Sequence, residues 1–330
     1  MTSSITARRI AVALAILALI AAPYAIGETY YVNIASQVLL YAIFALGLNV
    51  LVGYAGLVSL GHAGLFGVAA YVVASLLAAG YGHALAIPAG LVAGLLATAG
   101  FAALSLRATG ITFIMITLAL GEILWGLAYR WISLTNGDNG ISVAARPAPF
   151  GLSLGTARAF YDTTLIVFLL AIAVVAIFVR SPFGVALCGT RDQPRRMNAL
   201  GYHVLMIRFW AFMFSGLLTS VAGILFVYYN EFISPQALAL TASAEGLLMV
   251  ISGGAGTLLG PVVGAALVVI VKNVVSAYIT RWNFMLGAIF VAIVVFMPEG
   301  LVPGAVRLAR SAWRARGGAK TAASIAEPKP

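Results

Sequence analysis

Long apolar stretches separated by short polar turns fill most of this sequence. A helix needs roughly 20 apolar residues to cross the hydrocarbon of a bilayer, and the stretches are about that long. They lack the apolar and polar alternation of barrel strands, and backbone amides in lipid must be hydrogen-bonded within their own segment. The pattern predicts membrane-spanning helices over residues 10–26, 34–52, 61–80, 84–106, 111–131, 163–179, 209–229, 240–251, 258–279 and 284–297.

The predicted fold class is an all-α integral membrane protein with about ten transmembrane helices, of which 240–251 is short enough to be a half-helix. The composition agrees, since 62% of the 330 residues are apolar and 8% are charged. Soluble domains carry about 25% charged residues. Residues 1–303 are predicted to form one transmembrane domain, and residues 304–330 a basic, disordered cytoplasmic tail rich in Arg, Gly, Ala and Pro.

The basic residues are unevenly distributed among the loops. The chain carries a net charge of +10, and most of its Lys and Arg residues precede residue 10, follow residue 306 or lie in and around 181–208. Cytoplasmic loops are enriched in these residues, which predicts cytoplasmic termini, a cytoplasmic segment 181–208 and an external segment 133–162. The charge also favours contact with anionic membrane lipid. Nucleic-acid binding is not predicted, because no aromatic residues interleave with the basic ones.

The cytoplasmic segment 181–208 is longer than a turn between two helices requires. Asp192 is predicted to cap a short helix with Pro194 in its first turn, and Gly201 to end that helix in a left-handed conformation. Residues 184–188 are predicted to form a separate, earlier turn. A helix of about two turns is not stable alone, so it must pack against something.

This short helix presents apolar side chains beside cations. The residues concerned are Arg191, Arg195, Arg196, Met197 and Leu200. The mixture is typical of a partially buried contact with another protein. The alternative is a helix lying on lipid headgroups with its arginines on phosphates, which explains the arginines but not the glycine that ends the helix.

Several motifs extend this interpretation. They are Ser181-Pro-Phe-Gly184, Arg191-Asp192, Ala199-Leu-Gly201-Tyr202, Gly53-Tyr-Ala-Gly56, Ser59-Leu-Gly61-His62, Thr117-Leu-Ala-Leu-Gly-Glu122, Ile233-Ser-Pro235 and Gly253-Gly-Ala-Gly256. Together they resemble the inner-membrane permeases of ABC importers for branched-chain amino acids, the LivM type. The likeness covers residues 34–303.

The resemblance implies a multi-pass protein of the bacterial inner membrane with the cobalamin-importer-like (type II) permease fold. The implied partners are a second permease of the LivH type, two ABC ATPase subunits of the LivG and LivF types, and a periplasmic substrate-binding protein. It also implies that the segment from Arg191 through Asp192 to Gly201 is the coupling helix. This helix would dock in a groove on an ATPase and pass the closure of the ATPase dimer to the spans.

No catalytic constellation accompanies these motifs. A nucleotide-binding loop needs a lysine after its glycines, and neither glycine cluster has one. The three histidines are scattered, and no metal-ligand or nucleophile motif occurs. The chain is therefore predicted to be a transport subunit and not an enzyme, without a metal site or a cofactor of its own. ATP and Mg²⁺ would bind to the partner ATPases.

Two glycine clusters with a similar pattern follow the stretches 34–52 and 240–251. Broken helices at matched places in two halves of a transporter point to a translocation pathway. Close packing of helices through small residues explains the same glycines, and both interpretations stay open. The candidate pathway residues are Asn49, Gly53, Gly56, Ser59, His62, Glu122, Gly253, Gly254 and Gly256.

Polar residues within the apolar stretches leave further alternatives. Glu122 would either meet a substrate ammonium or bond a neighbouring helix such as the one that carries Asn49. His62, beside Ser59, is interpreted as a hydrogen-bonded structural residue before a substrate ligand. Lys272 is interpreted as snorkelling toward the outer membrane surface.

The external segment 133–162 is either an ordinary connector or the contact for a binding protein. The candidate contact residues are Thr135, Asn136, Asp138 and Asn139. The predicted function is import of a branched-chain amino acid or a related small polar solute, driven by ATP hydrolysed on other chains. Urea, amides and aromatic acids remain open as substrates. The alternative is a secondary transporter driven by an ion gradient, with Glu122 as the proton carrier.

Overall fold

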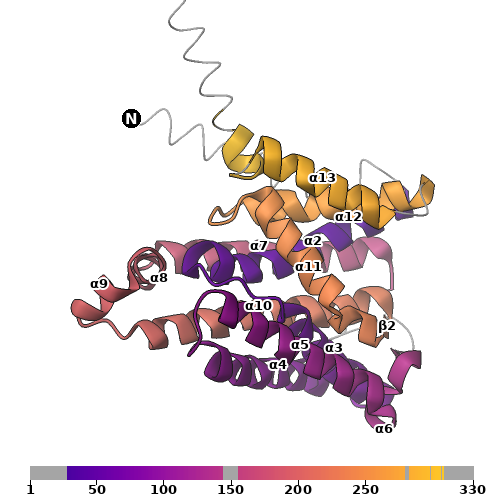
Figure 1. The fold of residues 1–330 in the computed structure, drawn as a ribbon. Coiled ribbons are helices and arrows are strands. Elements are labelled where there is room, and N and C mark those ends of the chain that lie inside the picture. Colours follow the sequence, from indigo (N-terminus) through magenta and orange to yellow (C-terminus); the bar gives the residue numbers. More distant parts are fainter. Residues whose placement is uncertain (1–27, 144–154, 279–281, 298, 306, 308–330) are drawn as a thin grey trace, which may run out of the picture.

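The computed structural model describes residues 28–143, 155–278, 282–297, 299–305 and 307. These residues form a helical bundle (Figure 1). Its helices are α2 (Thr29–Asn49), α3 (His62–Ala78), α4 (His83–Ser105), α5 (Ile111–Arg130), α7 (Ala157–Arg180), α10 (Val204–Asn230), α11 (Leu240–Gly253), α12 (Gly260–Tyr278) and α13 (Trp282–Phe296). The predicted helix 10–26 and nearly all of the tail 304–330 lie outside the described residues.

Every other predicted apolar stretch coincides with one of these helices, which confirms a helical membrane protein. Within the described part of the chain, 5 helices are long and apolar enough to cross a membrane. They are α2 with the π-helical turn η1 (Val50–Ala55) that continues it, α4, α5, α7 and α10. The helices α3 and α11 are shorter, and α11 agrees with the predicted half-helix. The total of about ten crossings stays a prediction.

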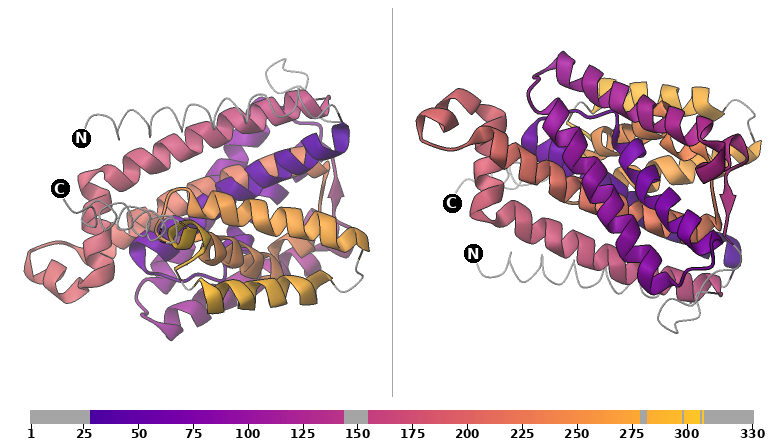
Figure 2. Two further views of the ribbon diagram at one scale, coloured as in Figure 1. Left: turned by 90° about the horizontal axis from the view of Figure 1, so that it is seen from above. Right: turned by 90° about the horizontal axis from the view of Figure 1, so that it is seen from below.

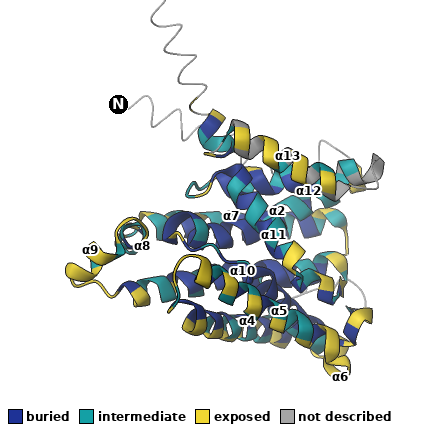
Figure 3. Cartoon of the chain, in the orientation of Figure 1, coloured by how far each residue is buried: buried dark blue, intermediate teal, exposed yellow. Residues whose placement is uncertain are grey.

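Two helices form the centre of the bundle and three lie at its periphery. In its most apolar window, α2 is 83% buried and α10 is 61% buried, against 28% or less in α4, α5 and α7. Figure 3 shows the same contrast between buried and exposed helices. A helix that stays apolar on its exposed face is typical of a membrane span. The exposed faces of α4, α5 and α7 therefore suit contact with lipid.

Small residues allow the helices to approach closely, which matters because the hydrophobic effect does not drive helices together in lipid. Gly94 of α4 lies against Ser220 of α10, and Gly216 of α10 lies against Thr98 of α4. A Cβ atom at either glycine would overlap the opposite side chain. This reciprocal contact is the small-residue packing expected between membrane helices.

Different structures form at the two ends of the bundle. At one end, which we call the strand end, α6 (Ile132–Thr135) and η2 (Gly137–Asn139) lead into β1 (Ile141–Ser142). This strand pairs antiparallel with β2 (Phe232–Ile233), which η4 (Pro235–Leu238) follows. At the other end, α8 (Pro182–Asp192) and α9 (Pro194–Ala199) form a helical hairpin. Both views in Figure 2 show this hairpin projecting away from the strand end.

Candidate functional site

The first helix of the hairpin begins at a Ser-Pro pair. The Ser181 Oγ accepts a hydrogen bond from the Gly184 amide at 3.2 Å, and Pro182 stands in the first turn, where it needs no donor. The helix α8 then runs without a break to Asp192. The predicted separate turn at residues 184–188 is therefore wrong, and Asp192 ends α8 instead of capping the next helix. The cap at Ser181 and burial of the α8 face explain why the helix continues past Gly189.

The second helix agrees better with its prediction. The helix α9 begins at Pro194, and Gly201 follows it in the left-handed region with φ +88°. The amide of Tyr202 then bonds the Met197 carbonyl oxygen at 3.1 Å, which closes the helix end. Met197 also packs back over Gly189 of α8. The two helices thus form one unit, and α9 is not a free arm.

The outer surface of α9 is exposed (Figure 3). Leu200, just after α9, is 65% exposed, and Arg195 and Arg196 are exposed beside it. An exposed leucine close to two exposed arginines at a projecting helix is the mixture typical of a protein contact. The predicted docking residues are therefore split, because Met197 faces α8 while these three face outward.

Three contacts anchor α8 to the bundle. Leu187 is fully buried in the hydrophobic core. Arg208, near the start of α10, donates from Nη2 to the Thr190 carbonyl oxygen at 2.7 Å. Arg191 donates from Nη1 to the Gly53 carbonyl oxygen at 2.6 Å, and from Nε to the Asp192 carboxylate at 2.8 Å. Charged hydrogen bonds of this kind are the strong ones, so α8 is tied to the end of α2 and to the start of α10.

The two glycine clusters meet at this point. The Asn49 amide donates from Nδ2 to the Thr257 carbonyl oxygen at 2.9 Å, and its Oδ1 accepts from the Gly256 amide at 2.9 Å. A Cβ atom at Gly53 would overlap the Gly256 amide nitrogen. We call the meeting point of Gly53, Gly56, Gly254 and Gly256 the glycine junction. The Asn49 amide is thus engaged in the junction and does not bond Glu122.

The conformation of the junction requires glycine. Gly56, Gly254 and Gly256 have φ values of +69°, +116° and +77°, which other residues adopt at a cost. The Arg191 side chain covers Gly56, and Gly300 of the segment after α13 packs on Gly254. Four parts of the chain thus converge here. The π-helical turn η1 leads into the same place, and such turns are frequent at functional sites.

Close packing accounts for the rest of the second cluster. A Cβ atom at Gly253 would overlap the Gly260 carbonyl oxygen, and one at Gly264 would overlap the Met249 carbonyl oxygen. The helix α12 therefore packs directly on α11 through small residues. Close packing of the glycines is therefore confirmed, and the helices break at both clusters. The translocation pathway stays a prediction.

The predicted structural arrangement of His62 agrees with its surroundings. Its side chain is fully buried, with Nδ1 2.8 Å from Ser59 Oγ and Nε2 3.0 Å from Ser215 Oγ. The Ser215 hydroxyl donates to the Gly47 carbonyl oxygen at 2.6 Å, so it accepts from Nε2–H. The network assigns the Nε2–H tautomer and occupies both ring nitrogens. Such a histidine holds the start of α3 to α10.

Glu122 is half-buried in α5. Among the described residues it has no hydrogen-bond or ion-pair partner. Its contact with a substrate stays a prediction.

The external candidates lie at the strand end. Thr135 is buried, and its Oγ1 lies 2.7 Å from the Ala128 carbonyl oxygen. Asn136 has φ +60° and donates from Nδ2 to the Gly140 carbonyl oxygen at 3.0 Å. The side chains of Asn136, Asp138 and Asn139 are exposed. Thr135 therefore serves the turn, and the other three are exposed on it. Their contact with a binding protein stays a prediction.

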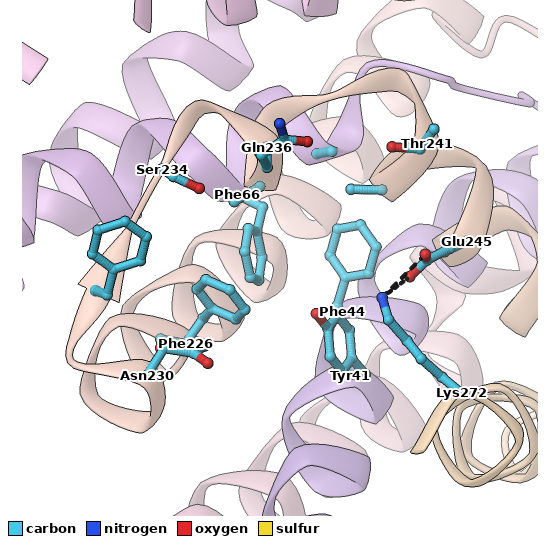
Figure 4. A pocket seen from close by; sticks show the side chains of 14 residues that line it. Tyr41, Phe44, Phe66, Phe226, Asn230, Ser234, Gln236, Thr241, Glu245 and Lys272 are labelled. Carbon is cyan, nitrogen blue, oxygen red and sulfur yellow. Dashed lines mark hydrogen bonds and ion pairs between the residues drawn. The ribbon is translucent and has the colours of Figure 1, made fainter. Parts of the chain in front are cut away.

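An ion pair that was not predicted lies between α11 and α12. Lys272 Nζ is 3.1 and 3.0 Å from the two carboxylate oxygens of Glu245 (Figure 4). Snorkelling of Lys272 toward the membrane surface is thus wrong, because its ammonium is directed at Glu245. The available signal was an acidic residue within the short apolar stretch 240–251, since ionisable residues in spans usually have partners.

Comparison with known proteins identifies the family. Residues 30–294 match the family described as branched-chain amino acid transport system / permease component. The high-affinity branched-chain amino acid transport system permease protein LivM of Salmonella typhimurium is 31% identical over 298 residues, which are 82% of this chain and 70% of that protein. LivM of Escherichia coli is 30% identical over 298 residues, with the same coverage of 82% and 70%.

A second group of relatives matches a shorter part. The autoinducer 2 import system permease protein LsrC of Yersinia enterocolitica is 30% identical over 139 residues, or 40% of this chain and 39% of that protein. No solved structure matches the chain. The match to the family model and the similarity to LivM confirm the resemblance, and the chain belongs to the permease components of branched-chain amino acid transport systems.

Proposed function

We propose that this chain is the transmembrane permease subunit of an ATP-driven importer for branched-chain amino acids or related small polar solutes. The observation that carries the proposal is the anchored hairpin. Its exposed end offers Leu200 together with Arg195 and Arg196, while its base is bonded to η1 at the end of α2 through Arg191 and to α10 through Arg208. A helix that only rested on lipid headgroups would not need these two bonds into the bundle.

The anchor suggests how a push on α9 would move the spans. Met197 holds α9 to α8, so the hairpin moves as one body. The bonds from Arg191 and Arg208 pass that movement to the end of α2 and the start of α10. Asn49 passes it on to the loop between α11 and α12. A shift of packed elements past each other is the kind of small movement that amplifies into a change of access.

The orientation follows from the hairpin. An ATPase lies in the cytoplasm, so the hairpin end and both termini are assigned to the cytoplasmic side of the inner membrane, and the strand end to the periplasm. Asn136, Asp138 and Asn139 then face a periplasmic binding protein. The other partners are a second permease of the LivH type and ATPases of the LivG and LivF types, which bind ATP and Mg²⁺. The membrane fold is proposed to be of the type II class.

Reconstitution tests this function. The chain is purified with its co-encoded partners, placed in liposomes containing ATP, and assayed for uptake of labelled L-leucine delivered by the binding protein. Uptake is expected to require ATP and to persist when an ionophore removes the proton gradient. Uptake by the isolated chain, or uptake lost with the proton gradient while ATP is present, contradicts the proposal and favours a secondary transporter.

A further inference from the structure

A half-open pocket of about 380 Å³ lies near the strand end of the bundle (Figure 4). Helices α2, α3, α10, α11 and α12 surround it, and the segment containing β2 and η4 contributes to its wall. Small-molecule sites have volumes of about 300–1,000 Å³. The pocket is therefore large enough for a small solute, and the proposed orientation opens it toward the periplasmic half of the membrane.

Its walls differ in chemistry. An aromatic wall consists of Phe44, Phe66 and Phe226 from three different helices. The Glu245 and Lys272 pair lies beside this wall, since Phe44 packs on Gly246, the neighbour of Glu245. Figure 4 shows both groups directed toward the same space. Ligand sites combine an apolar lining with a few well-placed polar groups in this way.

The ion pair is hard to explain as a simple helix tie. Glu245 is 19% exposed and Lys272 is 35% exposed at the side chain, so both charges have lost much of their solvation. Replacing a desolvated ion pair by apolar residues of the same volume is often neutral or stabilising, and ionisable groups in a membrane usually mark a substrate or ion path. The two helices that the pair joins, α11 and α12, already pack directly through Gly253 and Gly264. Nearby, Asn273 bonds Gln37 at 2.8 Å and joins α12 to α2 without any charge.

We propose that this pocket receives a zwitterionic amino acid with an apolar side chain on its way through the permease. The Glu245 carboxylate binds the ammonium group of the solute, the Lys272 ammonium binds its carboxylate, and the aromatic wall holds its side chain. This inference rests on the proposed function. Without solute the two residues neutralise each other, and with solute each charge exchanges one partner for another, so no charge is left unpaired in the membrane.

The route into the pocket begins at the external surface. Ser234 and Gln236 line the pocket and follow β2 directly. The strand β2 is paired with β1, where Ile141 is opposite Ile233. The turn that carries Asp138 comes just before β1. A binding protein that contacts this turn would thus stand beside the mouth of the pocket.

The first experiment uses the complete reconstituted importer and compares four variants. They are Glu245→Gln, Lys272→Met, the reversed pair Glu245→Lys with Lys272→Glu, and the control Gln37→Ala with Asn273→Ala. The single changes are expected to lower L-leucine uptake about tenfold or more, because each leaves one solute charge unpaired. Assembly of the complex, measured by size-exclusion chromatography, is expected to be unchanged. The control is expected to keep uptake within about twofold of wild type.

The reversed pair separates a binding role from a structural one. A pair that only joins helices works in either direction, so uptake restored to near the wild-type level would overturn the inference. Uptake that stays low in an assembled complex supports it. If the wild-type complex imports no amino acid with ATP, the proposed function is wrong. If both single variants import L-leucine normally, the proposed function stands and only the role of the pocket is wrong.

A second experiment leaves the ion pair intact. Cys188 is changed to Ser, and a single cysteine is introduced either at Ser234 in the pocket or at Tyr81, which is 54% exposed and outside it. Reaction with a thiol reagent is followed in the assembled complex, with empty or L-leucine-loaded binding protein. The leucine-loaded protein is expected to slow labelling of Ser234→Cys severalfold more than labelling of Tyr81→Cys. Equal effects at the two positions would overturn the inference.

Discussion

At the hairpin end of this bundle the helices touch through bare backbone, whereas at the strand end they separate around a pocket. Gly53 lies against the Gly256 amide, and Arg191 bonds the Gly53 carbonyl oxygen, with no space between them. At the other end, Phe44 and Glu245 both line a cavity. The direct contacts at the hairpin end can transmit a movement of the hairpin to the spans. The cavity at the strand end has room for a solute. The difference indicates one end for coupling and one for receiving substrate.

The largest expected effect comes from filling the glycine junction. Gly53→Val places a side chain where the Gly256 amide and the Asn49 amide oxygen already lie. Because backbone has to move, we expect the free energy of unfolding to fall by about 3 kcal/mol. Thermal melting of the purified complex measures the loss. Gly100→Val is the control, since Gly100 has no neighbour within 4 Å, and it should change the stability by about 0.5 kcal/mol or less. Equal melting of the two variants would show that the junction is not tightly packed.

The second effect concerns the tip of the hairpin. Leu200→Asp places a charge at a side chain that is 65% exposed, so folding should be unaffected. If Leu200 is buried against an ATPase, uptake should fall about tenfold or more, while the complex still inserts and the ATPase still hydrolyses ATP. Tyr81→Asp makes a similar change on a side chain that is 54% exposed, near the strand end, and should leave coupling intact. Normal uptake by Leu200→Asp would remove α9 from the coupling path.

A smaller effect is expected at the anchor. Arg191→Met keeps an unbranched side chain but removes the guanidinium and its bond to the Gly53 carbonyl oxygen, and a charged hydrogen bond is worth about 1.5–3 kcal/mol. We expect the number of L-leucine molecules imported per ATP to fall about fivefold, a loss of about 1 kcal/mol. Cross-linking between α9 and the ATPase should be unchanged. Arg191→Lys retains a donor and should give an intermediate ratio, and a Met variant as tightly coupled as wild type would contradict the role of the anchor.

The smallest effect is expected at the external turn. Asp138→Ala removes an exposed charge that is proposed to contact the binding protein, so the half-saturating concentration of that protein should rise about threefold, as for a charge at an interface rim. Thr135→Val tests the buried neighbour. It removes a hydrogen bond to the Ala128 carbonyl oxygen and should cost about 1 kcal/mol of stability without changing that concentration. If Thr135→Val raised the half-saturating concentration and Asp138→Ala did not, Asp138 would not belong to the contact surface.

Features that depend on neighbouring residues were predicted well. The helix positions follow from runs of apolar residues, and Pro194 and Gly201 bracket α9 because their backbone preferences act locally. The error at Asp192 came from two competing local signals. Asp192 is a good cap, but the cap at Ser181 and the burial of Leu187 extend α8 past it.

Features that join distant parts of the chain were mostly missed. The sequence names the helix of Asn49 only as one example of a partner for Glu122, and it does not predict that the Asn49 amide bonds the loop after α11. The sequence pattern does not single out Glu245 and explains Lys272 by snorkelling, whereas the structure pairs the two. The partner of a polar group in a span depends on which helices are adjacent, and the apolar pattern of each span is nearly the same for every arrangement.

The sequence by itself determined that this chain is a helical membrane protein and a permease, because hydrocarbon accepts only long apolar segments with internally satisfied backbone, and because its motifs match those of the family. Only the tertiary structure decided that the two glycine clusters meet, that Arg191 ties the hairpin to them, and that an ion pair faces an aromatic pocket. Those contacts depend on helix order and rotation in space, which close packing of small residues sets between segments far apart in the chain.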